Sequence, residues 1–310
     1  MELIKNINWN FLKYTPFWLS ISGLLIIISI VSLIIHNGPR YGIDFTGGRV
    51  LEVSFGSAPD IAKIRSVLAN KDFDAIEVQS VKKRPWVMFR VPISLDEQYK
   101  DFSQDMMELL RNNFTEEDGY KLEILSNDKV GPKVGQELRK KALWALLFSL
   151  IAMLIYITIR FQFRFGAGSI IALFHDTLIT IGFFSVFDKE ITLSIVAALL
   201  TIVGYSINDS IVVSDRVREN MGKLRRMNFY DLVNRSLNEV FSRTIITSFT
   251  VWITCWCLII WGGEVIRDFA LALLVGITVG TYSSVYIVTP LVVQWEKWFP
   301  KKVAAVTRAK

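Results

Sequence analysis

Residues 191–220, ITLSIVAALLTIVGYSINDSIVVSDRVREN, open as an apolar run long enough to cross a lipid bilayer, which takes about 20 residues. About two-thirds of the way through this run, Ser206, Asn208 and Asp209 stand where a membrane helix is normally apolar. Ser206 and Asp209 are three residues apart, so they share one face of a helix. An ionisable group at membrane depth usually faces protein or a water-filled path. The stretch therefore predicts a helix inside a bundle, with Asp209 turned towards the bundle interior.

Two roles for Asp209 stay open at this point. It could be a structural carboxyl, protonated or hydrogen-bonded to a neighbouring helix. It could also carry a proton or another ion, which is the usual role of a carboxyl within a membrane.

Composition supports a membrane protein. The 310 residues are 52% hydrophobic, with a mean hydropathy of +0.38, whereas soluble domains contain about 45–50% apolar residues. The chain has no G-x-x-x-x-G-K-[ST] phosphate-binding loop, so nucleotide bound through that motif is not its energy source. Cys255 and Cys257 lie in an apolar run and are expected to be small buried residues, since a metal site needs more ligands.

The apolar runs predict six transmembrane helices with one water-soluble domain. The first run is longer than the apolar core of a signal peptide and lacks a small-residue cleavage site, so we expect it to remain as a helix. The expected spans are residues 17–35, 138–159, 167–187, 191–214, 243–261 and 269–293. The expected segments between and around them are residues 1–16, 36–134, 215–242 and 294–310.

Residues 36–134 carry the pattern of a small α+β domain. Alternating or β-rich runs predict strands at 49–55, 75–81, 86–91 and 120–125, with residues 82–85 forming a hairpin turn. Helical spacing predicts helices over 59–70 and from a capping box at Ser94 to Glu97 onward. The order βαββαβ is that of a ferredoxin-like domain.

Glycine-rich segments flank this domain. Residues 42–48, GIDFTGG, predict a turn in which Gly47 and Gly48 permit positive φ, while Asp44 and Thr46 bond the local backbone. A shaped turn is favoured over a ligand site. Residues 127–135 lack periodicity and are expected to be an exit linker.

The basic residues predict which side of the membrane each segment faces. Residues 36–134 contain 14 Lys+Arg and 16 Asp+Glu, so the basic excess lies in the membrane part, as orientation signals do, and does not form a nucleic-acid patch. Both termini are then cytoplasmic and residues 36–134 are outside. Arg139, Lys140 and Lys141 would lie on the outer side, where basic residues are not expected in excess. We expect these three side chains to lean back towards the soluble domain or the headgroups. The cytoplasmic basic residues are Lys5, Lys13, Arg160, Arg164, those from Arg216 to Arg243, Lys297, Lys301, Lys302, Arg308 and Lys310.

Other polar residues accompany Asp209. His175 could relay a proton or satisfy its neighbour Asp176 in the third span. Arg243, at the start of the fifth span, could pair with Asp209 and be displaced when Asp209 takes a proton, or it could snorkel to the headgroups. In the sixth span, Gly276 and Gly280 form a G-x-x-x-G face for close helix packing.

Several of these segments together resemble the SecF members of the SecD/SecF family, protein-export membrane proteins of the bacterial Sec machinery and of the RND superfamily. The resemblance covers nearly the whole chain in order. Its motifs are GIDFTGG at 42–48, VGP at 130–132, His175-Asp176, GYSIND at 204–209, DRVREN at 215–220 and SRT at 242–244.

The resemblance implies a multi-pass protein of the bacterial inner membrane, with residues 36–134 periplasmic. It implies a complex with SecD that works beside the SecYEG channel, with YajC as a further partner, and promotes late stages of polypeptide export. It also implies the proton motive force as the energy source, an outer domain that changes conformation, and no metal or other cofactor. Asp209 and Arg243 match the residues implicated in proton passage, with Ser206, Asn208, Asp176 and His175 in support.

Two other functions stay open. A passive scaffold would only brace a partner. An intramembrane aspartyl protease would use Asp176 and Asp209, but it needs carboxyls close enough to share a proton. Helix counting places Asp209 a couple of turns from Asp176 in depth, which argues against the protease.

Overall fold

The computed structural model places two compact units, each described here by itself: Tyr41–Leu143, and Met1–Arg40 together with Trp144–Lys310. Lys5, the hairpin residues Lys82 to Arg84 and the basic residues after Phe299 lie outside the described residues. The structure describes residues 8–69, 71, 73, 75–80, 85–99, 101–160, 163–224 and 226–299.

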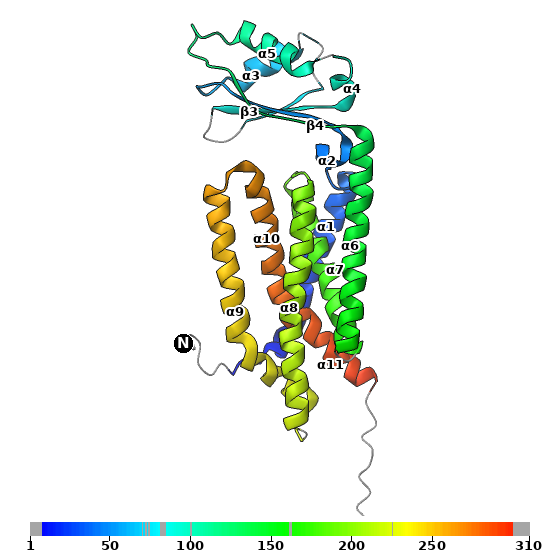
Figure 1. The fold of residues 1–310 in the computed structure, drawn as a ribbon. Coiled ribbons are helices and arrows are strands. Elements are labelled where there is room, and N and C mark those ends of the chain that lie inside the picture. The colour runs from blue at the N-terminus through cyan, green and yellow to red at the C-terminus, as the bar shows by residue number, and fades with distance from the viewer. Residues whose placement is uncertain are drawn as a thin grey trace, which may run out of the picture. The chain divides into compact units, whose positions relative to one another are not determined.

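Six helices of the described chain are long and apolar enough to cross a membrane, which confirms the six expected spans (Figure 1). The sixth span is interrupted, because a π-helical turn, η2, joins α10 to α11. The helices are α1 Thr15–Ile35 with the preceding 3-10 turn η1 Phe11–Tyr14, α6 Pro132–Arg160, α7 Phe163–Val186, α8 Leu193–Lys223, α9 Phe229–Trp261, α10 Gly263–Ser283, η2 Ser284–Val288 and α11 Thr289–Trp298.

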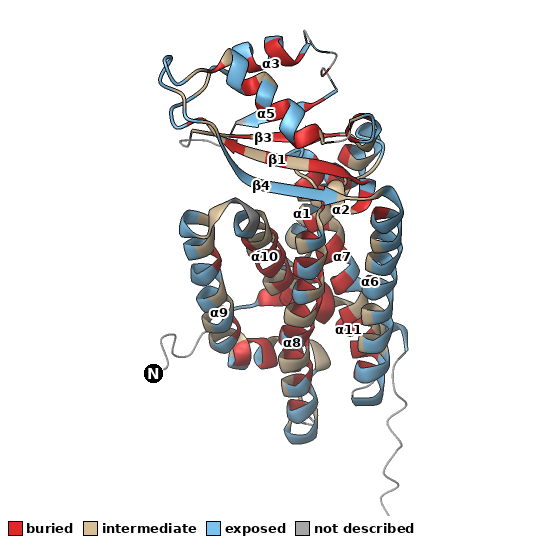
Figure 2. Cartoon of the chain, turned by 45° about the horizontal axis from the view of Figure 1, so that its top comes forward, coloured by how far each residue is buried: buried red, intermediate tan, exposed pale blue. Residues whose placement is uncertain are grey.

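The interior of the membrane unit is formed by α7, α8 and the sixth span, whose apolar stretches are more than half buried. By contrast, few residues of α1, α6 and α9 are buried, as the pale ribbon of α6 shows in Figure 2. Apolar exposure of this extent suits helices that face lipid or another membrane helix. Cys255 on α9 is buried as expected, but Cys257 is exposed.

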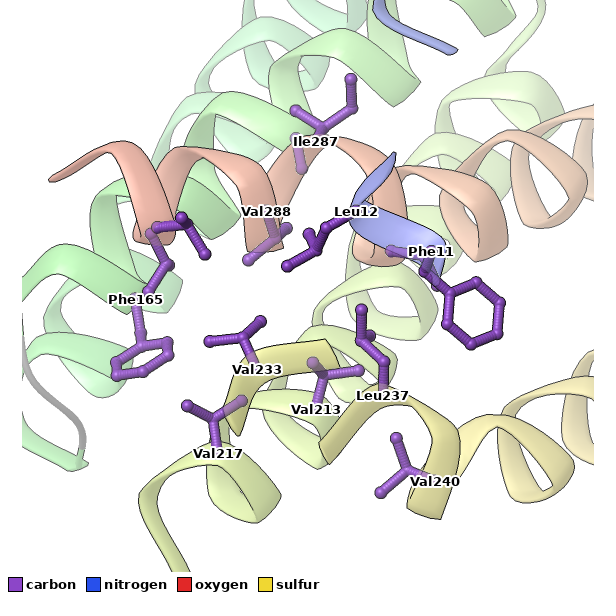
Figure 3. Close-up of a cluster of buried hydrophobic side chains, with 14 of the residues drawn as sticks. Phe11, Leu12, Phe165, Val213, Val217, Val233, Leu237, Val240, Ile287 and Val288 are labelled. Carbon is purple, nitrogen blue, oxygen red and sulfur yellow. The ribbon is translucent and has the colours of Figure 1, made fainter. Parts of the chain in front are cut away.

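One end of the membrane unit is closed by a cluster of buried apolar side chains. They come from η1, α7, α8, α9 and η2, which are far apart in the sequence (Figure 3). Packing of this kind holds the first turns of α9 to the bundle, and further along α9 Thr244 and Cys255 are also buried. The labelled members are Phe11, Leu12, Phe165, Val213, Val217, Val233, Leu237, Val240, Ile287 and Val288.

The second unit holds a four-stranded sheet of β1 Gly48–Ser54, β2 Glu77–Ser80, β3 Trp86–Val91 and β4 Glu123–Val130. The strand order is β2-β3-β1-β4, and every neighbouring pair is antiparallel. Helices α3 Ile61–Ala69 and α5 Phe102–Asn113 cover one face (Figure 1). The core between sheet and helices contains Leu51, Phe89, Ile64, Phe102, Met106 and Leu110.

Two expectations for this unit were wrong. A single helix from Ser94 does not form: Ser94 lies inside the short helix α4 Ile93–Asp96, and α5 begins separately, with Asp101 accepting from the backbone N–H of Gln104. The expected linker 127–135 is also structured, because β4 runs to Val130 and α6 begins at Pro132. As an edge strand with both faces largely exposed, β4 needs no alternation of apolar residues, so residues 127–130 do not read as a continuation of the strand expected at 120–125.

Candidate functional site

Asp209 lies on α8, with only 6% of its surface exposed. Its Oδ1 accepts a hydrogen bond of 2.7 Å from Oγ1 of Thr244 on α9. Its Oδ2 accepts a hydrogen bond from Oγ of Ser284, the first residue of η2. The carboxyl therefore joins three segments of the bundle through two hydroxyl groups.

Arg243 does not pair with Asp209 in this structure. Its side chain is exposed, and no ion pair between the two is found among the described residues. The adjacent residue, Thr244, is the one whose side chain turns inward, because neighbouring residues on a helix point about 100° apart.

Asp176, on α7, is fully buried and accepts three hydrogen bonds. Nδ1 of its neighbour His175 lies 2.8 Å from its Oδ1. Oγ of Ser206 on α8, at 2.6 Å, and Oγ of Ser283 on α10, at 2.9 Å, both donate to its Oδ2. His175 thus satisfies Asp176, which is one of the two roles that the sequence left open for it.

A line of hydrogen bonds continues from His175. Its Nε2 lies 3.0 Å from the hydroxyl of Tyr282, which lies 2.9 Å from Oγ of Ser22 on α1. With the Nδ1–H tautomer, His175 donates to Asp176 and accepts from Tyr282. The imidazole is then fully satisfied in its neutral form.

Gly276 and Gly280 bring α10 against α8. A Cβ at Gly276 would lie 2.2 Å from Cδ1 of Ile202, and one at Gly280 would lie 3.0 Å from Cβ of Ser206. The same Cβ at Gly280 would lie 3.4 Å from Oδ2 of Asp176. Gly280 therefore leaves the room that lets the Asp176–Ser206 hydrogen bond form beside α10.

The structure assembles part of the expected site and adds to it. Asn208 is exposed and, among the described residues, gives no hydrogen bond to this cluster, because it points to another face of α8. Ser283, Ser284 and Tyr282 were missed, although the polar run TYSS at 281–284 in an apolar span was a usable signal. The depth estimate was wrong as well: the partner of Asp176, Ser206, is only three residues from Asp209.

The two carboxyls are nevertheless not arranged as a proteolytic pair. Each uses both oxygens to accept from other side chains, and no hydrogen bond joins the carboxyls to each other among the described residues. What the arrangement can do is hold and release protons. Oγ of Ser284 can also donate to the carbonyl of Thr281, at 2.9 Å, and Oγ of Ser283 to that of Gly280, at 3.1 Å. Each serine therefore keeps an acceptor whichever protonation state its carboxyl has.

The expected turn at 42–48 contains a short helix, α2 Ile43–Thr46. Oγ1 of Thr46 donates to the carbonyl of Gly42, at 3.1 Å. Gly47 and Gly48 have φ of 75° and 127°, and a Cβ at Gly48 would lie 2.6 Å from the carbonyl oxygen of Val91. Only glycine fits both the backbone and the space at position 48.

The start of α6 packs on this segment within the same unit. A Cβ at Gly135 would lie 3.0 Å from the backbone of Phe45. The guanidinium of Arg139 lies 4.3 Å from the ring centroid of Tyr41, a cation–π contact. The side chain of Arg139 therefore leans towards Tyr41, at the start of the unit Tyr41–Leu143, in the direction expected for this basic residue.

Models of known families match both the glycine-rich segment at 42–48 and the helices that carry the buried carboxyls. Residues 32–59 match the model of the SecD/SecF GG motif, and residues 110–298 match that of the C-terminal region of the protein export membrane protein SecD/SecF. The second match includes every residue of the buried polar cluster except Ser22.

Similar full-length proteins are named protein translocase subunit SecF. One from Calditerrivibrio nitroreducens is 42% identical over 94% of this chain and 96% of its own length. One from Rickettsia felis is 38% identical over 98% of this chain and 97% of its own.

The crystal structure of SecDF, a translocon-associated membrane protein from Thermus thermophilus, is similar with a TM-score of 0.83 and 37% identity. The match covers 94% of this chain and 39% of that longer one. A second SecDF structure, in the super-membrane-facing form, gives a TM-score of 0.69 over 95% of this chain and 40% of the other.

The fold and the buried carboxyls thus define a multi-pass membrane protein of the protein-export class. The chain belongs to the SecD/SecF family, among the SecF translocase subunits.

Proposed function

We propose that this chain uses the proton motive force, together with a SecD subunit, to promote late stages of polypeptide export, and that Asp209 is the proton-coupling carboxyl. The SecF relatives and the SecDF structures, whose chains are more than twice as long, support a SecD partner. Protons are the coupling ion, and no metal or other cofactor takes part.

The observation that carries the proposal is the setting of Asp209. It is buried at membrane depth, where an unpaired charge costs about 3 kcal/mol, yet its two partners are neutral hydroxyls. Ser284 can turn to the carbonyl of Thr281 when Asp209 binds a proton. A carboxyl fixed by an ion pair would lack this freedom.

Arg243 takes part from the exposed side of α9. A guanidinium facing hydrocarbon is costly, so we expect the partner subunit to cover this helix. Covering α9 would bring Arg243 into a drier environment, where its charge acts more strongly on Asp209. Arg243 thereby favours release of the proton that Asp209 has taken up.

Residues 41–143 act on the polypeptide outside the membrane. The sheet order β2-β3-β1-β4 with α3 and α5 on one face supports a ferredoxin-like domain. The protein lies in the bacterial cytoplasmic membrane with both termini inside, beside SecYEG and YajC. Proton passage at Asp209 changes the conformation of this domain, which pulls or releases the polypeptide.

The test is export of a secreted precursor in cells that carry the SecD partner and Asp209→Asn in place of the original chain. Export is expected to fall towards the level without the protein, while membrane level and SecD association hold. Asp231→Asn, an exposed carboxyl in the first turn of α9, is the matched control. Unchanged export with Asp209→Asn would refute proton coupling at this residue and favour the passive scaffold.

A further inference from the structure

Ser283 and Ser284 are consecutive residues at the junction of α10 and η2, and they donate to different buried carboxyls: Ser283 to Asp176 and Ser284 to Asp209. We infer that Asp176 is a second proton-holding carboxyl, and that Asp176 and Asp209 together control the α10–η2 junction through these two serines. The inference rests on the proposed function in one respect, since it assigns this pair of carboxyls to the same proton-driven movement.

The contacts of Asp176 suit both of its protonation states. As a carboxylate it accepts from His175, Ser206 and Ser283. When its Oδ1 is protonated and donates to Nδ1 of His175, Oδ2 becomes a neutral and weaker acceptor, and Ser283 can then donate to the carbonyl of Gly280, 3.1 Å away. No donor is left unsatisfied in either state, so burial does not lock the carboxyl in one of them.

The contacts of Asp176 also form a relay. It begins at Tyr282, which lines a mostly apolar groove of about 490 Å³ between η1, α1, α9 and α10. A proton arriving at the Tyr282 hydroxyl passes on to Nε2 of His175, while Nδ1 gives its proton to Oδ1 of Asp176 and then accepts from it. The tyrosine ends unchanged, the imidazole ends neutral with its proton on Nε2, and the carboxyl gains one proton.

The junction is a suitable element to move. A π-helical turn is less regular than an α-helix and is often found at functional sites. While both carboxyls are charged, Ser283 and Ser284 tie the turn Ser284–Val288 to α7 and α8. When both are protonated, the two hydroxyls return to carbonyls of α10 itself, and these ties weaken together.

The charged and titratable groups around the pair are few. His175 comes from α7 and Tyr282 from α10, while Arg243 on α9 acts on Asp209. From α1 the described contact is the neutral Ser22. A pH response of the junction therefore reports these groups, and variants can separate Asp176 from the rest.

The test is hydrogen–deuterium exchange of backbone amides in residues 280–289, measured against pH on the full chain with its SecD partner in lipid nanodiscs. After correction for intrinsic exchange, the wild-type segment is expected to exchange about tenfold faster per released carboxyl at acid pH, the effect of losing one hydrogen bond to a charged group. In Asp176→Asn and in Ser283→Ala, the rise in exchange rate at acid pH should be about tenfold smaller than in the wild type. The matched control is Ser214→Ala, a buried serine on α8 that donates to the carbonyl of Ser210, at 2.7 Å.

A wild-type pH profile in both Asp176→Asn and Ser283→Ala would overturn the inference and leave Asp176 a structural residue. If Asp176→Asn does not assemble, Ser283→Ala decides alone, since it keeps the bonds of Asp176 to His175 and Ser206. The exchange measurement needs no export, so its failure is distinct from failure of the proposed function, which Asp209→Asn tests through export.

Discussion

Thr244 donates a hydrogen bond of 2.7 Å to Oδ1 of Asp209 and thereby connects α9 to α8 inside the bundle. Arg243, one residue earlier, is exposed on the outside of the same helix. Thr244 thus holds the carboxyl within this chain, whereas the Arg243 side chain lies on the outer surface of α9. A change at either position should affect coupling in a different way.

Thr244→Val should lower export while leaving assembly intact. The substitution keeps the side-chain shape but removes the donor to Asp209, which we expect to cost up to about tenfold in export rate through the unsatisfied buried oxygen. Export of a secreted precursor with the SecD partner present measures the effect. Thr201→Val is the control, because Thr201 is exposed on α8 and donates to the carbonyl of Ala197. Equal export by the two variants would count against the role of Thr244.

Gly276→Ala should destabilise the membrane unit by about 1–3 kcal/mol, the usual effect of overpacking. The added Cβ would lie 2.2 Å from Cδ1 of Ile202, and Ile202→Ala in the same chain should restore part of the loss. Thermal unfolding of the purified chain in detergent measures both. Gly23→Ala, where nothing lies within 4 Å of the new Cβ, should change the unfolding midpoint little. No recovery in the double variant would contradict the α8–α10 contact.

Gly48→Ala should destabilise the soluble unit by more than about 1 kcal/mol, since alanine is strained at positive φ and its Cβ would collide with the Val91 carbonyl. Gly119→Ala is a matched control with φ of 82° but open space around its Cβ. Amide exchange of β1 and β3 in the full chain compares the two. If Gly119→Ala loosens these strands as much as Gly48→Ala, the close approach to Val91 is not the cause.

Asp96 should make the soluble unit acid-sensitive. Burial alone would raise the pKa of Asp96, but the contacts with Lys129, at 2.5 Å, and Arg49, at 2.6 Å, outweigh it and hold the pKa below its ordinary value of 3.8. A lowered folded-state pKa means that the stabilisation is present above pH 3.8 and is lost as the pH falls through the folded-state value.

Removing the charge tests this directly. Asp96→Asn should cost about 3–5 kcal/mol near neutral pH, because it leaves Arg49 without its buried partner. Amide exchange of β1 and β4 measures the loss, and Asp128→Asn, an exposed carboxyl on β4, should leave exchange unchanged. The acid-induced rise in exchange should be smaller in Asp96→Asn than in the wild type. An identical acid profile would assign the sensitivity to other carboxyls.

The sequence predicted the six long apolar helices and the burial of Asp209 inside the bundle, because long apolar runs and a charge among them are strong local signals. It failed for segments whose structure depends on distant contacts. The sequence predicts a strand at 120–125 and a linker from residue 127, yet β4 runs on to Val130 because it pairs with β1. Ser94 fits a capping box, yet Asp101 begins the longer helix instead.

By itself the sequence determined that this protein is a six-span membrane protein of the SecF kind with an ionisable residue inside the bundle. Only the tertiary structure decided what that residue touches. Ser283 and Ser284 reach Asp176 and Asp209 because the glycines of α10 let it approach α8 and because a π turn follows α10 beside both carboxyls. Hydrogen bonds of about 3 Å depend on such helix-to-helix distances, and no local sequence pattern specifies them.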